Sequence, residues 1–220
     1  MTCCEGFTSC NGFVLLSLCV IATVLNLVPM FADYAMDGFL FRHPVSCFEW
    51  WLPGVVGGGI LVLPSVAMAF AAKKQGSCNS RCGMLFSACL CVFSVIGAIY
   101  CLLVSLFALG TGPLICQGAD ASLSSCNFTI KDIGSLSELN FDISWYLNED
   151  GCWNRTEDGT EGNRILSAGL ELDKDELVNL HVVTFTGLAA VSLLEVLFSL
   201  LQVLAGIGGC VCGTSKRREQ

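Results

Sequence analysis

The residues of this chain that could carry chemistry are one glutamate inside an apolar stretch, two histidines and fifteen cysteines. Glu195 lies within the apolar stretch 182–211. Burying a charged carboxylate in an apolar environment is costly, so we expect Glu195 to be protonated or hydrogen-bonded. Asn26 and Gln202 are the expected partners in a polar clasp between helices. In the alternative interpretation, Glu195 and Gln202 line a path for a proton or an ion.

Catalysis requires a nucleophile and a base in one pocket. The histidines are His43 and His181, and no pattern in the sequence places a serine or cysteine nucleophile beside either of them. The patterns GxGxxG, G-x-S-x-G and HExxH and the Walker sequence are absent, and no pair of aspartates lies within apolar stretches. The sequence therefore predicts a protein that is not an enzyme and that needs no cofactor.

The elements that must position these residues follow from composition. Hydrophobic residues make up 54% of the 220 residues and charged residues only 14%, against about 25% charged in soluble domains. This balance excludes a soluble globule and a disordered chain. A membrane-spanning helix needs about 20 mostly apolar residues. Four stretches qualify, so we predict an all-α membrane protein, a bundle of four transmembrane helices at 12–31, 53–72, 84–109 and 182–211.

Charged residues segregate between the segments that join these helices. Segments 73–83 and 212–220 are basic, whereas segments 32–52 and 110–181 are acidic. Basic residues mark the cytosolic side, so we predict that both termini, including 1–11, are cytosolic and that the acidic segments are luminal. Two N-x-[ST] sequons, at Asn127 and Asn154, lie in segment 110–181 and are predicted to carry glycans.

The cysteines divide between the same compartments. The four luminal ones suggest two disulfides, for which three connectivities are possible. If all four pair, Cys47 of segment 32–52 must form a disulfide with a cysteine of segment 110–181. The luminal cysteines are Cys47, Cys116, Cys126 and Cys152.

Seven further cysteines lie at the cytosolic ends of the helices, where a thiol can carry a palmitoyl chain. A zinc site built from some of them is disfavoured, because no cytosolic histidine accompanies them. The remaining cysteines, inside the spans, are interpreted as small apolar residues. The lipidation candidates are Cys3, Cys4, Cys10, Cys78, Cys82, Cys210 and Cys212, and the span cysteines are Cys19, Cys89, Cys91 and Cys101.

Segment 110–181 is too long for an unstructured connection. It is predicted to form a small disulfide-linked subdomain, either a binding surface or a solubilising lid. We expect a short strand within 141–147 and a helical approach to the last span over 166–180, capped by Ser167, Asp173 or Asp175.

The second span contains a small-xxx-small pair, Gly54 and Gly58. Such a pair lets two helix backbones approach closely. We expect close packing inside the bundle, with a dimer face as the alternative.

Four motifs distributed along the chain resemble those of the transmembrane 4 L six family. They are MTCCEGFTSCNGF at 1–13, CFEWWLPG at 47–54, GPL at 112–114 and GCVCG at 209–213. The resemblance covers all four spans and is weakest in the long loop. True tetraspanins carry a Cys-Cys-Gly motif in that loop, whereas this chain has only Gly151-Cys152-Trp153.

The resemblance implies that Cys116 pairs with Cys152, which leaves Cys47 with Cys126. It also implies a non-catalytic adaptor that binds other membrane proteins laterally. One branch of the family further implies control of the intramembrane proteolysis of a membrane-anchored transcription factor in the endoplasmic reticulum.

From these observations we expect partners that are membrane proteins and lipids, not nucleic acids, contacted through small-residue faces, with a homo-oligomer possible. The expected location is the endoplasmic reticulum or other endomembranes, with the plasma membrane as the alternative. The alternative function is a lipid-responsive or proton- or ion-linked transport protein that uses Glu195.

Overall fold

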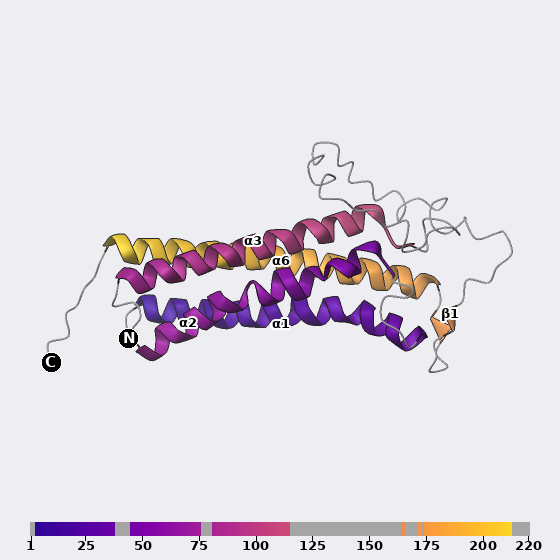
Figure 1. The fold of residues 1–220 in the computed structure, drawn as a ribbon, viewed down its shortest axis with the longest axis horizontal. Helices are drawn as coiled ribbons and strands as arrows, with labels where there is room; N and C mark the ends of the chain where they lie inside the picture. The colour runs from indigo at the N-terminus through magenta and orange to yellow at the C-terminus, as the bar shows by residue number, and fades with distance from the viewer. Residues whose placement is uncertain are drawn as a thin grey trace. The chain divides into compact units, whose positions relative to one another are not determined.

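The computed structural model describes residues 3–37, 45–75, 81–114, 164–165, 171–172 and 174–212. Its long helices are α1 (Cys3–Asp37), α3 (Arg81–Thr111) and α6 (Lys174–Cys212) (Figure 1). Among these described residues, four segments are long and apolar enough to cross a membrane, at Phe7–Phe31, Cys47–Ala71, Leu85–Thr111 and Glu176–Gly208. The prediction of four membrane-spanning helical segments is confirmed.

The chain divides into two compact units. Unit 1 comprises Met1–Val24, Pro53–Leu102 and Leu188–Gln220, and unit 2 comprises Leu25–Leu52 and Leu103–Gly187. Helices α1, α3 and α6 each contribute residues to both units.

The second span is not the single helix that the sequence predicts over 53–72. It consists of a 3-10 helix η1 (Cys47–Trp51), a π-helix η2 (Pro53–Ile60) and the α-helix α2 (Leu63–Gln75). The Leu61 N–H bonds to the Val56 carbonyl at 3.1 Å, five residues back, and the pattern then changes. Pro64 supplies the reason, because it has no N–H for the Ile60 carbonyl and its ring clashes with that carbonyl in a continuous α-helix.

The helical approach to the last span begins at Lys174, later than expected. Two short strands precede it, β1 (Arg164–Ile165) and β2 (Glu171–Leu172), which pair antiparallel. The prediction of helix is therefore wrong at Glu171 and Leu172. The cap candidates Ser167 and Asp173 lie outside the described residues, as does the strand expected within 141–147.

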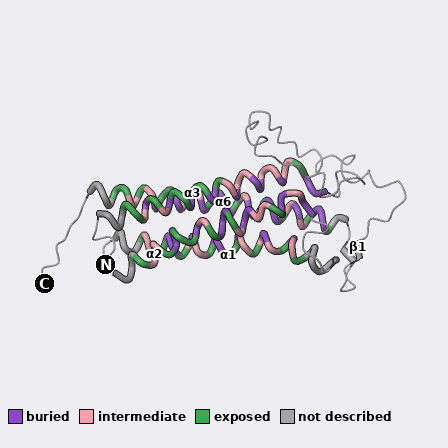
Figure 2. Tube along the Cα trace, viewed as in Figure 1, coloured by how far each residue is buried: buried purple, intermediate pink, exposed green. Residues whose placement is uncertain are grey.

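Small residues share the buried positions of unit 1 with a cluster that includes Leu15 and Val62. Figure 2 shows buried and exposed residues alternating along the helices. Without a hydrophobic force between helices in lipid, small side chains allow the close contact that dispersion requires. The small buried residues of α1, α2 and α3 include Ala22, Ala69, Ala88, Cys91, Ala98 and Cys101.

In unit 2, the loop before η1 is held by local hydrogen bonds. The Ser46 hydroxyl accepts a bond from the Phe48 N–H at 3.4 Å, and Glu49 Oε1 accepts one from the Ser46 N–H at 3.1 Å. This capping box satisfies donors at the start of η1. The Leu114 N–H donates to the Val45 carbonyl at 2.9 Å, which joins this loop to the end of α3.

In unit 2, the His181 side chain of α6 contacts the backbone of α3. Its Nε2 lies 3.1 Å from the Ala108 carbonyl, and its ring packs on Phe185 with centroids 4.8 Å apart. The imidazole is buried, and its contact with Ala108 joins α6 to α3.

Candidate functional site

The polar interior of unit 1 begins with an amide pair between the first and last spans. Asn11 of α1 donates from Nδ2 to Gln202 Oε1 at 2.8 Å and to the Phe198 carbonyl at 3.1 Å. Both amide side chains are buried. A buried amide in an apolar environment is costly unless it is hydrogen-bonded, so this pair joins α1 to α6 specifically.

Ser65 extends the hydrogen-bonded network to the other two helices. Gln202 Nε2 donates to the Ser65 carbonyl at 3.5 Å, and the Ser65 hydroxyl donates to the Leu90 carbonyl of α3 at 3.2 Å. The series of contacts therefore runs from α1 to α6, α2 and α3. We call Asn11, Gln202 and Ser65 the amide network.

The amide network corrects the clasp expected from the sequence. Gln202 is bonded to Asn11, which the sequence places in the cytosolic segment 1–11. Because α1 starts at Cys3, Asn11 lies well inside the helix. A helical periodicity extended backwards would have found it, because Asn11, Leu15, Leu18 and Ala22 recur at helical spacing and all are buried.

Glu195 is fully buried, and neither of its carboxyl oxygens has a hydrogen-bond partner among the described residues. The predicted hydrogen bonds from Glu195 to Asn26 and Gln202 are therefore wrong. Asn26 is itself buried and belongs to unit 2. A Cβ added at Gly58 would lie 3.1 Å from Glu195 Oε2 and 3.4 Å from Oε1, so the carboxyl group packs on the backbone of η2.

Both glycines of the predicted packing pair are buried. Gly58 faces the Ala22 side chain of α1 as well as Glu195. The face of Gly58 is therefore occupied within the chain and is not available as a dimer face.

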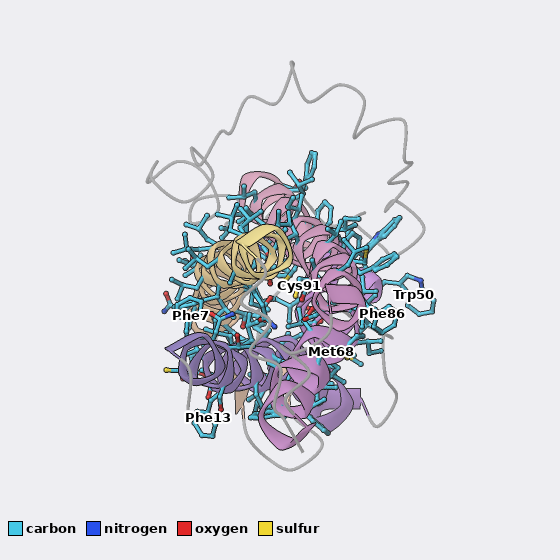
Figure 3. The ribbon with its side chains drawn as sticks, turned by 90° about the vertical axis from the view of Figure 1, so that its left-hand side faces the viewer. Phe7, Phe13, Trp50, Met68, Phe86 and Cys91 are labelled. Atoms are coloured by element: carbon cyan, nitrogen blue, oxygen red, sulfur yellow. The ribbon has the colours of Figure 1, made fainter. Side chains whose placement is uncertain are left out.

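The span cysteines differ in exposure. Cys19, Cys91 and Cys101 are buried, and the Cys19 thiol donates to the Gly59 carbonyl at 3.6 Å. Figure 3 shows Cys91 between the helices and Phe86 directed outward. Cys89, in contrast, is exposed on α3.

Of the cysteines with proposed modifications, Cys10 is exposed and unpaired and Cys47 is disulfide-bonded. The other lipidation candidates lie outside the residues whose side chains are described. The disulfide candidates Cys116, Cys126 and Cys152 and the sequons at Asn127 and Asn154 lie outside the described residues. Within the described part of the chain, no group of three or more His, Cys, Asp or Glu side chains could hold a metal ion.

A family model described as L6 membrane protein matches residues 2–216. The chain belongs to the L6 membrane protein family. This confirms the resemblance drawn from the four motifs, and the L6 chain is a multi-pass membrane protein.

Relatives of this L6 protein match over nearly their full length. Transmembrane 4 L6 family member 20 of Homo sapiens is 40% identical over 228 residues, which cover 100% of this chain and 99% of the relative. Member 20 of Mus musculus is 39% identical over 227 residues, with the same coverage. Member 1 of Homo sapiens is more distant, at 27% identity over 227 residues, 96% of this chain and 94% of the relative. No solved structure matches the chain.

Proposed function

We propose that this L6 protein is a non-catalytic polytopic adaptor that binds partner membrane proteins through lateral helix contacts. The observation that carries the proposal is the division of side chains in unit 1. The amide network, small residues and a cluster of buried aliphatic side chains around Leu15 fill the interior, whereas many large apolar side chains of all four spans are exposed. The interior contacts hold the helices to one another, and the outward face is the surface that a partner helix can meet.

The outward face of α3 is the surface best suited to a partner. Phe86 and Phe93 are seven residues apart, so they lie on one side of the helix, and both are more than half exposed. Aromatic side chains are enriched where protein surfaces bind one another. Since Gly58 is occupied inside the chain, we assign lateral contact to this aromatic face and not to the small-residue face expected from the sequence.

The resemblance to one branch of the family supports a more specific role. In it, the protein regulates the intramembrane proteolysis of a membrane-anchored transcription factor in the endoplasmic reticulum. The mechanism we propose is sequestration, in which the aromatic face of α3 occupies the partner's transmembrane helix and keeps a protease from it. Both termini are cytosolic and segment 110–181 is luminal in this proposal.

Photo-crosslinking tests the aromatic face. Benzoylphenylalanine placed at Phe86 or Phe93 is expected to give protein adducts in native membranes, whereas at Phe13 of α1 it is expected to give lipid adducts only. Phe13 is a matched control, because it is 65% exposed and Phe93 is 56% exposed. The variant Phe86→Ala/Phe93→Ala is expected to bind partners less and to restore their cleavage. Equal adducts at all three positions would contradict the assignment.

Glycosylation tests the proposed topology. Asn127→Gln and Asn154→Gln are each expected to remove one glycosidase-sensitive step in electrophoretic mobility, and the double variant both steps, because only a luminal sequon is modified. A wild-type chain with no glycosidase-sensitive shift would reject the luminal assignment of segment 110–181.

A further inference from the structure

We propose that Glu195 is a proton-binding site whose protonation state controls the packing of α6 against the π-helix η2. The Glu195 carboxyl group is fully buried inside unit 1 and has no hydrogen-bond partner among the described residues. A proton site here is independent of any adaptor function.

The surroundings of Glu195 require it to hold a proton. Among the side chains that the structure describes in unit 1, Glu195 is the only Asp, Glu, Lys or Arg. An ionised carboxylate with no cation beside it is too costly to keep in such an interior, and the group binds a proton instead. The ligand of the site is therefore a proton supplied by water.

The titratable neighbours do not offer a positive charge. From α1, the Cys19 thiol is close enough for an ionised Glu195 to act on it electrostatically. From α3, Tyr100 and Cys101 surround Gly57, the glycine next to Gly58, each with an atom 3.0 Å from a Cβ placed there. From η2, Gly58 presents only backbone to the carboxyl group. Removing the proton would therefore leave an uncompensated negative charge.

The π-helix η2 is the element that such a charge would displace. Ionised Glu195 needs water, and water can reach it only if the contact between the carboxyl group and Gly58 opens. Helix η2 is suited to move, because π-helical hydrogen bonding is rare and is frequently found at functional sites. In addition, the break before Pro64 separates η2 from α2. Opening would also uncover Cys19, whose thiol donates to the Gly59 carbonyl at 3.6 Å.

Dicyclohexylcarbodiimide provides the first test, because it enters bilayers and reacts with protonated carboxyl groups. The purified full chain in lipid nanodiscs is expected to carry the adduct on Glu195 at neutral pH and to lose it progressively at alkaline pH. The peptide containing Glu195→Gln is expected to carry none. Modification of the wild-type chain to the same extent at every pH would overturn the proposal without reference to any variant.

Alkylation of Cys19 by N-ethylmaleimide provides the second test. Thiol reactivity rises with pH in any protein, so the quantity measured is the ratio of wild-type to Glu195→Gln rates at each pH. This ratio is expected to be near one at neutral pH and to rise about tenfold at alkaline pH, a change equivalent to about 1.4 kcal/mol in the opening equilibrium.

Two controls separate the titration of Glu195 from a general loosening of the bundle. Ser199→Ala alters a buried polar residue one turn away and is expected to behave as the wild type. Gly58→Ala adds a methyl group 2.8 Å from the Ala22 Cβ and is expected to uncover Cys19 at every pH. A ratio for wild type over Glu195→Gln that stays constant with pH would show that ionisation of Glu195 does not open the contact.

Discussion

Replacing Gly97 with alanine is expected to lower the free energy of unfolding by about 3 kcal/mol, the upper range for overpacking a close contact. A Cβ at Gly97 would lie 2.6 Å from the Leu61 Cβ and 2.7 Å from the Gly57 carbonyl oxygen. Neither atom belongs to the flexible end of a side chain, so α3 and η2 must separate to admit the methyl group. The measurement is unfolding by sodium dodecyl sulfate in mixed micelles, followed by circular dichroism.

Gly208→Ala is the matched control for this prediction. It changes a helical glycine of α6 in the same way, but a Cβ there meets nothing within 4 Å. Its unfolding is expected to match that of the wild type or to occur at slightly higher detergent, since alanine favours helix over glycine by about 1 kcal/mol. Equal destabilisation by Gly97→Ala and Gly208→Ala would show that the approach of α3 to η2 is not decisive.

The contact between Gly57 and Gly97 is reciprocal, because a Cβ at Gly57 would lie 2.6 Å from the Gly97 carbonyl oxygen. Either substitution alone separates the two backbones. We therefore expect Gly57→Ala/Gly97→Ala to cost less than the sum of the single changes, as is usual for residues in direct contact.

Asn11→Leu is expected to destabilise the fold by about 2 kcal/mol, within the range for leaving a buried polar group unpaired. The substitution removes the donor to Gln202 Oε1 and to the Phe198 carbonyl, both inside the bundle. Hydrogen bonds between membrane helices contribute only about 0.6 kcal/mol on average. The larger value expected here is the cost of leaving Gln202 Oε1 and the Phe198 carbonyl buried without a donor, and not the strength of one hydrogen bond. The same detergent titration measures it.

The double variant Asn11→Leu/Gln202→Leu separates these two terms. Since it removes both partners, it is expected to be more stable than Asn11→Leu alone and to give a favourable coupling energy in a double-mutant cycle. Ser17→Ala serves as the control, because the exposed Ser17 hydroxyl bonds only to the Phe13 carbonyl of its own helix. A double variant whose loss equals the sum of the single losses would show that the amides do not act as a pair.

Local features of the sequence predicted the spans well and their interior poorly. The length of each apolar stretch is sufficient to identify a segment that must satisfy its backbone internally. Pro64 also carried a local signal for the break between η2 and α2, since its missing N–H is a property of one residue. Gly57 and Gly58 of η2 also make close contacts with other helices, and the partners of these contacts cannot be read from this segment alone.

The candidate site shows the same division. Sequence reasoning identified Glu195 and Gln202 as the polar groups of the last span, and both are buried. It assigned them to each other and to Asn26, because the rotation and depth of α1 beside α6 cannot be read from either helix alone. The structure instead bonds Gln202 to Asn11.

The sequence by itself determined that this protein spans a membrane four times and that a lone acid lies in its last span, because apolar length and residue type are local properties. Only the tertiary structure decided which side chains meet. Partner choice inside a bundle depends on helix rotation and on the gaps that small residues leave, as at Gly58, where a backbone without a side chain admits the Glu195 carboxyl group.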